Sequence, residues 1–159
     1  PKKIGGGIAF TGIPNLLVSA DVAWIEWSAW DVIELKDDKG KKVSELVENW
    51  EDGIRAGIGL EYDLPAFKIR GAFYTEPPAA ISETMTPVIP DAGRRTVAGI
   101  GVEIPFGSLR LHVIYEKMFI NSLTVEKWVL TSDGTGYENM AGHYEMNVNN
   151  LMIGFDYTF

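Results

Sequence analysis

The stretch Gly53-Ile54-Arg55-Ala56-Gly57-Ile58-Gly59-Leu60-Glu61-Tyr62-Asp63-Leu64 alternates without a break between apolar residues and residues that are glycine or charged. Successive side chains of a β-strand point to opposite faces, so this period of two predicts a strand. Its apolar face carries Ile54, Ala56, Ile58, Leu60, Tyr62 and Leu64, and its other face carries Gly53, Arg55, Gly57, Gly59, Glu61 and Asp63. Such a strand needs partners, which the rest of the chain must supply.

The same period recurs along the chain. It is found in six further segments, at residues 4–12, 16–35, 67–76, 96–104, 109–116 and about 144–159. Short connections at 12–15, 63–67 and 105–108 alternate with long polar connections at 36–51, 76–94 and 117–142. Strands connected in this way form an antiparallel up-and-down meander. The sequence therefore predicts an all-β protein with about seven strands.

The segment 16–35 is the least regular of these strands. Its alternation is clean from Val18 to Trp24 and becomes ambiguous at Glu26, while Trp24, Trp27 and Trp30 are spaced by three residues. A spacing of three also fits one face of a helix. Because the flanking residues are β-branched or aromatic and keep the period of two, we predict one long strand with a β-bulge near Glu26.

Two kinds of barrel share this alternation. A transmembrane β-barrel turns its apolar face outward to lipid, whereas a soluble calycin-like barrel turns it inward. The polar faces hold isolated charges among the glycines Gly57, Gly59, Gly99, Gly101 and Gly154, which favours a small, wet inner face. A strand of about 13 residues tilted by about 45° rises about 31 Å, enough to cross a hydrocarbon core. We therefore predict a transmembrane barrel.

The strict period then assigns each residue of the strand 53–64 to lipid or to the lumen. The residues expected to face lipid are Ile54, Ala56, Ile58, Leu60 and Tyr62, and those expected to face the lumen are Arg55, Gly57, Gly59 and Glu61. The soluble alternative would instead place the apolar set in a packed interior. Tryptophans 24, 27, 30, 50 and 128 are predicted to lie in an interfacial belt, with apolar ligand contacts as the alternative.

The composition excludes several classes of function. The 159 residues include 22 acidic and 14 basic side chains, a formal net charge of −8, so nucleic acid is not an expected partner. The sequence has no cysteine, which excludes disulfides, thiolate metal sites and a cysteine nucleophile. His112 and His143 lack the spacing of metal ligands, and the segment 132–136 is interpreted as a polar turn rather than a weak Ca²⁺ site. No metal or cofactor is expected.

The sequence was compared with two common motifs, a glycine-rich dinucleotide-binding loop and a serine nucleophile elbow, and matches neither. The run Gly5-Gly6-Gly7 with Gly12 lies within a period-two strand, so it does not predict a dinucleotide-binding loop. A Gly-x-Ser-x-Gly elbow does not occur in the sequence. We predict that the protein is not an enzyme, with an outer-membrane lipid-modifying enzyme built around His112 as a minor alternative.

Several motifs resemble a known family in their order and spacing. They are Ser19-Ala20-Asp21-Val22-Ala23-Trp24-Ile25-Glu26-Trp27-Ser28, then Asn49-Trp50-Glu51-Asp52 leading into Arg55-Ala56-Gly57-Ile58-Gly59-Leu60-Glu61-Tyr62, then Lys68-Ile69-Arg70-Gly71-Ala72-Phe73, and Ile89-Pro90-Asp91-Ala92-Gly93-Arg94-Arg95. Over nearly the whole chain this set resembles the FadL/TodX family of outer-membrane transporters for long-chain fatty acids and hydrophobic compounds. The ending Leu151, Ile153, Phe155, Tyr157 and Phe159 also looks like the C-terminal assembly signal of bacterial outer-membrane proteins.

The resemblance implies a fourteen-stranded barrel in the bacterial outer membrane, with an N-terminal hatch in its lumen and a lateral exit for the ligand. The chain would supply roughly the last seven strands of such a barrel as one segment, residues 1–159, without the hatch. Glu51 stands where the family pattern Trp-Lys-Asp has a lysine, so no carboxylate-binding role is expected at this position.

Charged residues on the predicted lumen face are the candidate ligand contacts. The basic ones, which carry the charge to meet a fatty acid carboxylate, are Arg55, Lys68, Arg70 and Arg110; Asp21, Glu61 and His112 complete the candidate set. The alternative is a structural network of ion pairs, in which the cations are neutralised by the inward carboxylates Asp21, Glu61, Asp63, Glu103, Glu116 and Asp156. If Arg70 and Arg110 guide an anionic head group, replacing both with Gln should weaken fatty acid binding and leave binding of a neutral hydrocarbon largely intact.

Seven is an odd number of strands, whereas bacterial single-chain barrels have an even number. We therefore expect Pro1 to lie at the extracellular end of the first strand, and the first and last strands to pair with the N-terminal remainder of the same barrel, with a second copy of the chain as the alternative. The other expected partners are hydrophobic small molecules, namely fatty acids or aromatic hydrocarbons, and outer-membrane lipid or lipopolysaccharide. Two functions stay open: passive transport of hydrophobic molecules, and a structural or adhesive barrel that acts through its loops.

Overall fold

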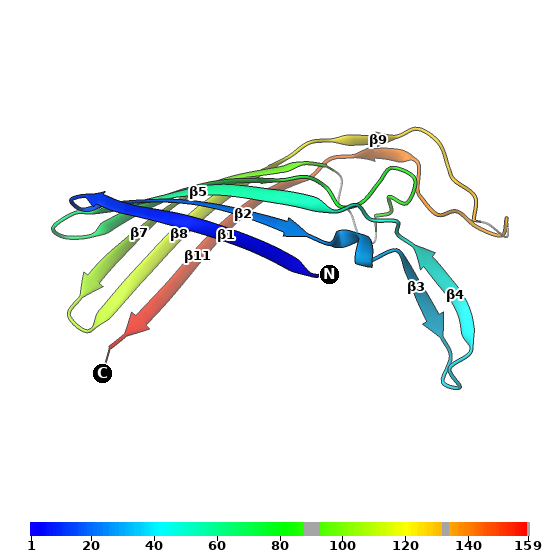
Figure 1. Ribbon diagram of the computed structural model, residues 1–159, viewed down its shortest axis with the longest axis horizontal. Helices are drawn as coiled ribbons and strands as arrows, with labels where there is room; N and C mark the ends of the chain where they lie inside the picture. The colour runs from blue at the N-terminus through cyan, green and yellow to red at the C-terminus, as the bar shows by residue number, and fades with distance from the viewer. Residues whose placement is uncertain (88–92, 132–133, 159) are drawn as a thin grey trace.

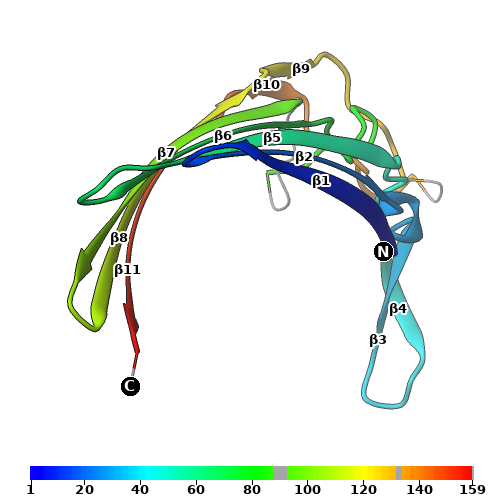
Figure 2. The same ribbon diagram turned by 60° about the vertical axis from the view of Figure 1, so that its left-hand side comes forward.

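The chain folds around one curved antiparallel sheet. A computed structural model describes residues 1–87, 93–131 and 134–158. Seven strands form the sheet in the order β1-β2-β5-β6-β7-β8-β11. They are β1 (Lys3–Ile13), β2 (Leu16–Ile25), β5 (Gly53–Asp63), β6 (Lys68–Glu76), β7 (Arg95–Phe106), β8 (Leu109–Ile120) and β11 (Asn147–Tyr157). Figures 1 and 2 show the sheet bent into an open arch.

The connections differ strongly between the two ends of the sheet. At one end, here named the turn end, the strands are joined by short turns that include Asn15 and Gly107, with φ of 63° and 62°. At the other end, named the loop end, the connections are long and carry two small hairpins. These are β3 (Val32–Lys36) with β4 (Lys42–Val47), and β9 (Leu123–Val125) with β10 (Gly142–Tyr144). This confirms the predicted meander of short turns and long connections.

The prediction of one long strand over 16–35 is wrong. β2 ends at Ile25, a short 3-10 turn η1 (Trp27–Ala29) follows, and the chain enters β3 at Val32. The loss of period near Glu26 therefore marks the end of a strand and not a bulge. The cause is distant in sequence, because Trp27 and Trp30 turn back to pack on Trp50, with ring centroids 5.7 and 4.9 Å away.

The apolar side chains of the sheet lie exposed on one face, named here the outer face. Exposed fractions on this face include 58% for Ile54, 56% for Ile58 and 61% for Ile100. The other large exposed residues of this face include Ile4, Ile8, Val22, Leu60, Tyr62, Ile69, Phe73, Tyr115, Leu151, Ile153 and Phe155. The apolar residues of the strand 53–64 therefore do not enter a packed interior, which contradicts the soluble-barrel alternative.

The buried apolar cluster lies among the loop-end connections instead of under the sheet. It contains Trp50, Ala79, Ala80, Met85 and Val125, with Trp27, Leu123 and Tyr144 packed against it. The cluster packs the connections against one another at the loop end of the sheet. No helix of the described residues is long and apolar enough to span a membrane.

The sheet ends in two open edges. Within the described residues, β1 pairs with β2 and β11 pairs with β8, and the two edge strands do not pair with each other. The seven strands are thus the wall of a barrel that is not closed within this chain.

Candidate functional site

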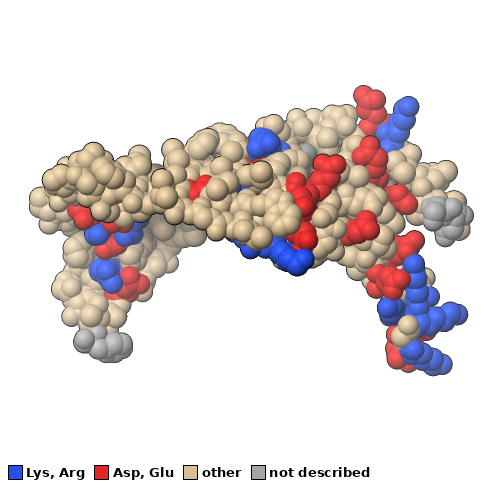
Figure 3. All heavy atoms as spheres, viewed as in Figure 1, with Lys and Arg blue, Asp and Glu red and all other residues tan. Residues whose placement is uncertain are grey.

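The polar face of the sheet, named here the inner face, holds all of the predicted site residues. Pairing between strands brings small residues into one row across it, since Ser19 is opposite Gly59, Gly59 is opposite Ala72, and Ala72 is opposite Gly99. Charged residues lie on both sides of this row along the strands. Figure 3 shows charged atoms gathered beneath the outer surface of the arch at its left, which is the turn end.

The charges near the turn end form one connected set, named here the ion-pair network. Its members come from five strands and are Glu61, Asp63, Lys68, Arg70, Glu103, Arg110, His112 and Asp156. Lys68 Nζ lies 3.1 Å from Glu61 Oε1 and 3.0 Å from Asp63 Oδ1. Every second residue of a strand points to the same face of the sheet, and residues on neighbouring strands lie opposite each other. The alternation in the sequence therefore brings these charged side chains together on the inner face.

Arg70 and Glu103 are at the centre of this network. Arg70 Nε donates to Glu61 Oε2 at 2.6 Å, and its Nη2 donates to Glu103 Oε2 at 2.5 Å. Glu103 is only 5% exposed, and Arg110 and His112 approach its carboxylate at 4.0 and 3.6 Å. A buried carboxylate needs such partners, because removing one leaves a charge without compensation. Glu103 was expected from the sequence among the inward carboxylates that neutralise the cations, and the structure places it against Arg70 and Arg110.

His112 links the network to the last strand. Its Nε2 lies 3.0 Å from Asp156 Oδ2, and Arg110 Nη2 lies 3.5 Å from the same oxygen. Its Nδ1 lies 3.4 Å from Arg70 Nη1. In the part of the chain that the structure describes, no cluster of His, Asp and Glu has the arrangement of a metal site. The His112 ring lies between the carboxylates of Glu103 and Asp156.

Arg55 and Asp21 lie apart from this network. The guanidinium carbon of Arg55 lies 4.1 Å from the ring centroid of Tyr74, and its Nε is buried without a hydrogen-bond partner. A Cβ atom added at Gly57 would lie 3.1 Å from both Asp21 Oδ1 and Tyr74 Cβ, so Asp21 extends over this glycine towards Tyr74. The structure thus divides the predicted set, with Glu61, Lys68, Arg70, Arg110 and His112 in the network and Arg55 and Asp21 outside it.

Three of the five tryptophans form one aromatic cluster. Trp27, Trp30 and Trp50 pack together at the loop end, and Trp50 is only 8% exposed. Trp50 Nε1 donates to Glu48 Oε2 at 2.9 Å. Of the three, Trp50 is buried and Trp30 is 37% exposed, and the interfacial belt stays a prediction for these tryptophans.

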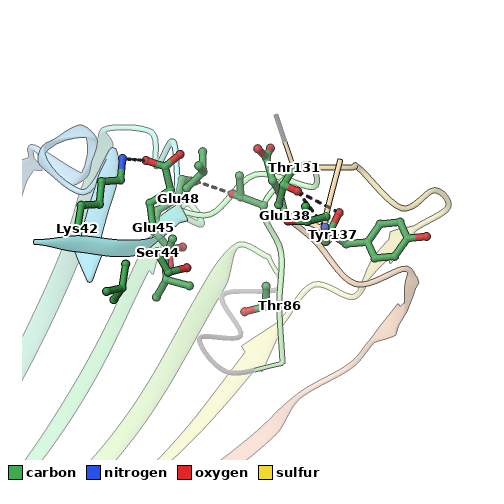
Figure 4. A pocket seen from close by; sticks show the side chains of 14 residues that line it. Lys42, Ser44, Glu45, Glu48, Thr86, Thr131, Tyr137 and Glu138 are labelled. Carbon is green, nitrogen blue, oxygen red and sulfur yellow. Dashed lines mark hydrogen bonds and ion pairs between the residues drawn. The ribbon is translucent and has the colours of Figure 1, made fainter. Parts of the chain in front are cut away.

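An open groove of about 740 Å³ lies at the loop end between β4 and the segment around residues 131–138. Figure 4 shows Lys42, Glu45 and Glu48 on one side of it and Thr131, Tyr137 and Glu138 on the other. A hydrogen bond from Lys42 to Glu45 satisfies the lysine and raises its pKa. The remaining charges on the groove are acidic, so it is not suited to an anion. The turn predicted at 132–136 falls partly here, with Ser132 and Asp133 outside the described residues.

An open all-β wall with an exposed apolar outer face and a polar inner face defines an outer-membrane β-barrel protein. The family model described as "Outer membrane protein transport protein (OMPP1/FadL/TodX)" matches residues 11–159, and the chain belongs to this family. It is therefore a protein of the bacterial outer membrane. The motif residues 89–92 and the terminal Phe159 lie outside the described residues.

A solved structure has the same fold. The crystal structure of a Pseudomonas aeruginosa FadL homologue matches with a TM-score of 0.79 and 18% sequence identity. The match covers 96% of this chain and 34% of that one, so the chain spans about a third of the length of the solved protein. A search of curated proteins gave no match.

Proposed function

We propose that the protein takes part in the passive passage of hydrophobic small molecules, either long-chain fatty acids or aromatic hydrocarbons, across the outer membrane. The observation that carries this proposal is the row Ser19, Gly59, Ala72 and Gly99, which places small residues on four neighbouring strands across the inner face. Membership of a family of transport proteins supports the same function. The ion-pair network is assigned a structural role and not a catalytic one.

The outer face and the two edges suggest the surroundings of the chain. Exposed residues such as Ile54, Ile58 and Ile100 suit contact with outer-membrane lipid or lipopolysaccharide. Unpaired backbone groups cost several kcal/mol each in hydrocarbon, so β1 and β11 require further strands. We propose that residues 1–159 are one barrel segment and that further strands of the same barrel supply these partners. A structure of the protein as the cell makes it, with β1 paired directly to β11, would overturn this arrangement.

The transport proposal is tested by uptake. Cells that make the protein, and cells that lack it, are given radiolabelled oleate and radiolabelled toluene, and the initial rate of entry is measured. Faster entry of either compound in cells with the protein supports the proposal. Equal rates for both compounds overturn it.

A second candidate function is a structural or adhesive barrel that acts through its extracellular connections. The polar groove between β4 and residues 131–138 favours it, because a groove of this size at the mouth offers a surface for an external partner. Deletion of residues 37–41 from the tip of the β3–β4 hairpin separates the two functions. Loss of surface adhesion with unchanged uptake favours the adhesive barrel, and unchanged adhesion counts against it.

A further inference from the structure

We propose that Arg55, which lies against the ring of Tyr74, receives the anionic head group of an amphiphile in the lumen, and that the ion-pair network does not. The inference rests on the proposed passage of hydrophobic molecules and adds the residue that distinguishes charged from neutral ones. It assigns different roles to basic residues that the sequence alone left equivalent.

The network has no cation free for a ligand. Arg70 contacts both Glu61 and Glu103, Lys68 contacts Glu61 and Asp63, and Arg110 contacts Asp156. Its carboxylates are four, Glu61, Asp63, Glu103 and Asp156, against three permanent cations, Lys68, Arg70 and Arg110. A ligand carboxylate would add a further negative charge where carboxylates already outnumber the cations, which is unfavourable. Anion binding at the network is therefore disfavoured.

Arg55 is in the opposite situation. Among the described residues no carboxylate forms an ion pair with it, and its buried Nε makes no hydrogen bond. Tyr74 covers the guanidinium at 4.1 Å, an attraction that holds the side chain in place without neutralising its charge. A half-buried cation without a counter-ion favours an incoming anion, because the new pair replaces the hydration that burial has removed.

The surroundings of Arg55 leave room for a ligand. Gly57 and Gly59 follow it on the same face of β5, and Ala72 and Gly99 continue the row of small residues on the next two strands. Lys3 shares the face as well, but it lies exposed at the start of the edge strand β1. Arg55 instead belongs to β5, which has neighbours on both sides. The site thus combines a fixed cation with a stretch of wall that is built from small residues.

Asp21 sets a limit on the affinity of this site. Its carboxylate extends over Gly57 next to Tyr74, so it lies close to where the head group of a ligand would sit. A like charge at this place repels an anion and lowers its affinity. Removing that charge should therefore strengthen the binding of an anionic ligand and leave a neutral one unchanged.

The test compares oleate with oleyl alcohol, which have the same chain length and differ in charge. Binding to the purified protein, as the cell makes it, is measured by calorimetry in detergent for wild type, Arg55→Gln and Arg94→Gln. Arg94 is a charge-matched control, because it is exposed at the loop end and contacts Thr75 at 3.3 Å. We expect Arg55→Gln to weaken oleate binding by about tenfold, with less than about a twofold change for oleyl alcohol and for the control.

Two further variants complete the experiment. Arg55→Lys should recover part of the oleate affinity, and Asp21→Asn should raise it by about threefold, since both act on charge at the same place. Equal loss of both ligands in Arg55→Gln, or selective loss of oleate in Arg110→Gln only, overturns the assignment of Arg55 and leaves the proposed passage intact. Wild-type protein that binds neither ligand overturns the proposed function itself.

Discussion

Arg70 Nη2 lies 2.5 Å from Glu103 Oε2, and this contact joins β6 to β7 through a carboxylate that is 5% exposed. The same arginine reaches Glu61 on β5 through its Nε. One side chain therefore ties three successive strands together on the inner face. The buried carboxylate of Glu103 therefore has a cationic partner, and the four carboxylates of the network lie together at the turn end of the sheet.

The first prediction concerns this contact. Arg70→Gln removes the nearest cation from Glu103 and should lower the free energy of unfolding by about 2 kcal/mol, because a buried charged acceptor loses its donor. Urea titration in detergent micelles, read by the mobility of the folded barrel in gels, measures the change. Lys36→Gln is the control, since Lys36 pairs with Glu34 at 2.9 Å on an exposed hairpin and should cost less than about 0.5 kcal/mol. Equal losses in the two variants would contradict the central role of Arg70.

The second prediction concerns pH at the loop end. Ser28 N donates to Asp52 Oδ1 at 2.9 Å, and hydrogen bonding from Ser28 lowers the pKa of Asp52 below its ordinary value of 3.8. A lowered pKa stabilises the folded loop above pH 3.8, and this contribution is lost as the pH falls through the lowered value. The amide resonance of Ser28 should titrate with a midpoint below 3.8, and Asp52→Asn should abolish the transition. A midpoint at or above 3.8 would be inconsistent with the contact.

The third prediction uses the close approach of two connections. A Cβ atom at Gly93 would overlap the backbone carbonyl oxygen of Asn121, and a rigid backbone atom cannot move aside easily. Gly93→Ala should therefore destabilise the protein by about 1–3 kcal/mol. Gly154→Ala is the matched control, because a Cβ there meets nothing within 4 Å. Urea midpoints that fall equally in both variants would show that the crowding at Gly93 is not the cause.

The fourth prediction concerns the aromatic cluster. Trp50→Ala removes a ring that is 8% exposed and packed on Trp27 and Trp30, a change that costs about 3–5 kcal/mol in a packed core. Because the cluster lies outside the sheet, we expect local opening of the connections and an intact barrel. Limited proteolysis should cut residues 77–87 faster in this variant than in Trp128→Ala, where the ring is 49% exposed. Loss of the folded barrel band on gels would instead show that the aromatic cluster and the sheet unfold together.

The strands were predictable from sequence because each side of the sheet has its own environment. In β5 every second residue is exposed on the outer face, so a period of two in the sequence maps directly onto the structure. The end of β2 was not predictable in this way. It depends on the packing of Trp27 and Trp30 on Trp50, which lies twenty or more residues away in the sequence. The alternation of side chains within a segment carries no information on such a distant contact.

The charged residues of the inner face were predictable from the sequence, and their pairing was not. The period of two in the sequence is enough to place Arg55 and Arg70 on the same face of the sheet, the inner face. It does not show that Arg70 finds Glu61 and Glu103 while Arg55 finds the ring of Tyr74. That difference depends on strand register, which sets Glu61 opposite Arg70 and leaves Arg55 without an ion pair among the described residues.

The last prediction tests which face meets the membrane. Ile58 lies midway along β5 on the outer face, 56% exposed, with Ala20 and Phe73 opposite it on the neighbouring strands. An arginine at the lipid-facing midplane of a barrel costs about 2–4 kcal/mol, so Ile58→Arg should destabilise the protein by this amount in phospholipid bilayers. Ala72→Arg is the matched control, because Ala72 lies one residue from Phe73 at the same level of β6 but on the inner face. Its arginine would point into a wet lumen beside small residues, where a charge keeps its hydration, and should cost less than about 1 kcal/mol. Folding titrations in bilayers that rank the two variants in the opposite order would require the inner and outer faces to be exchanged.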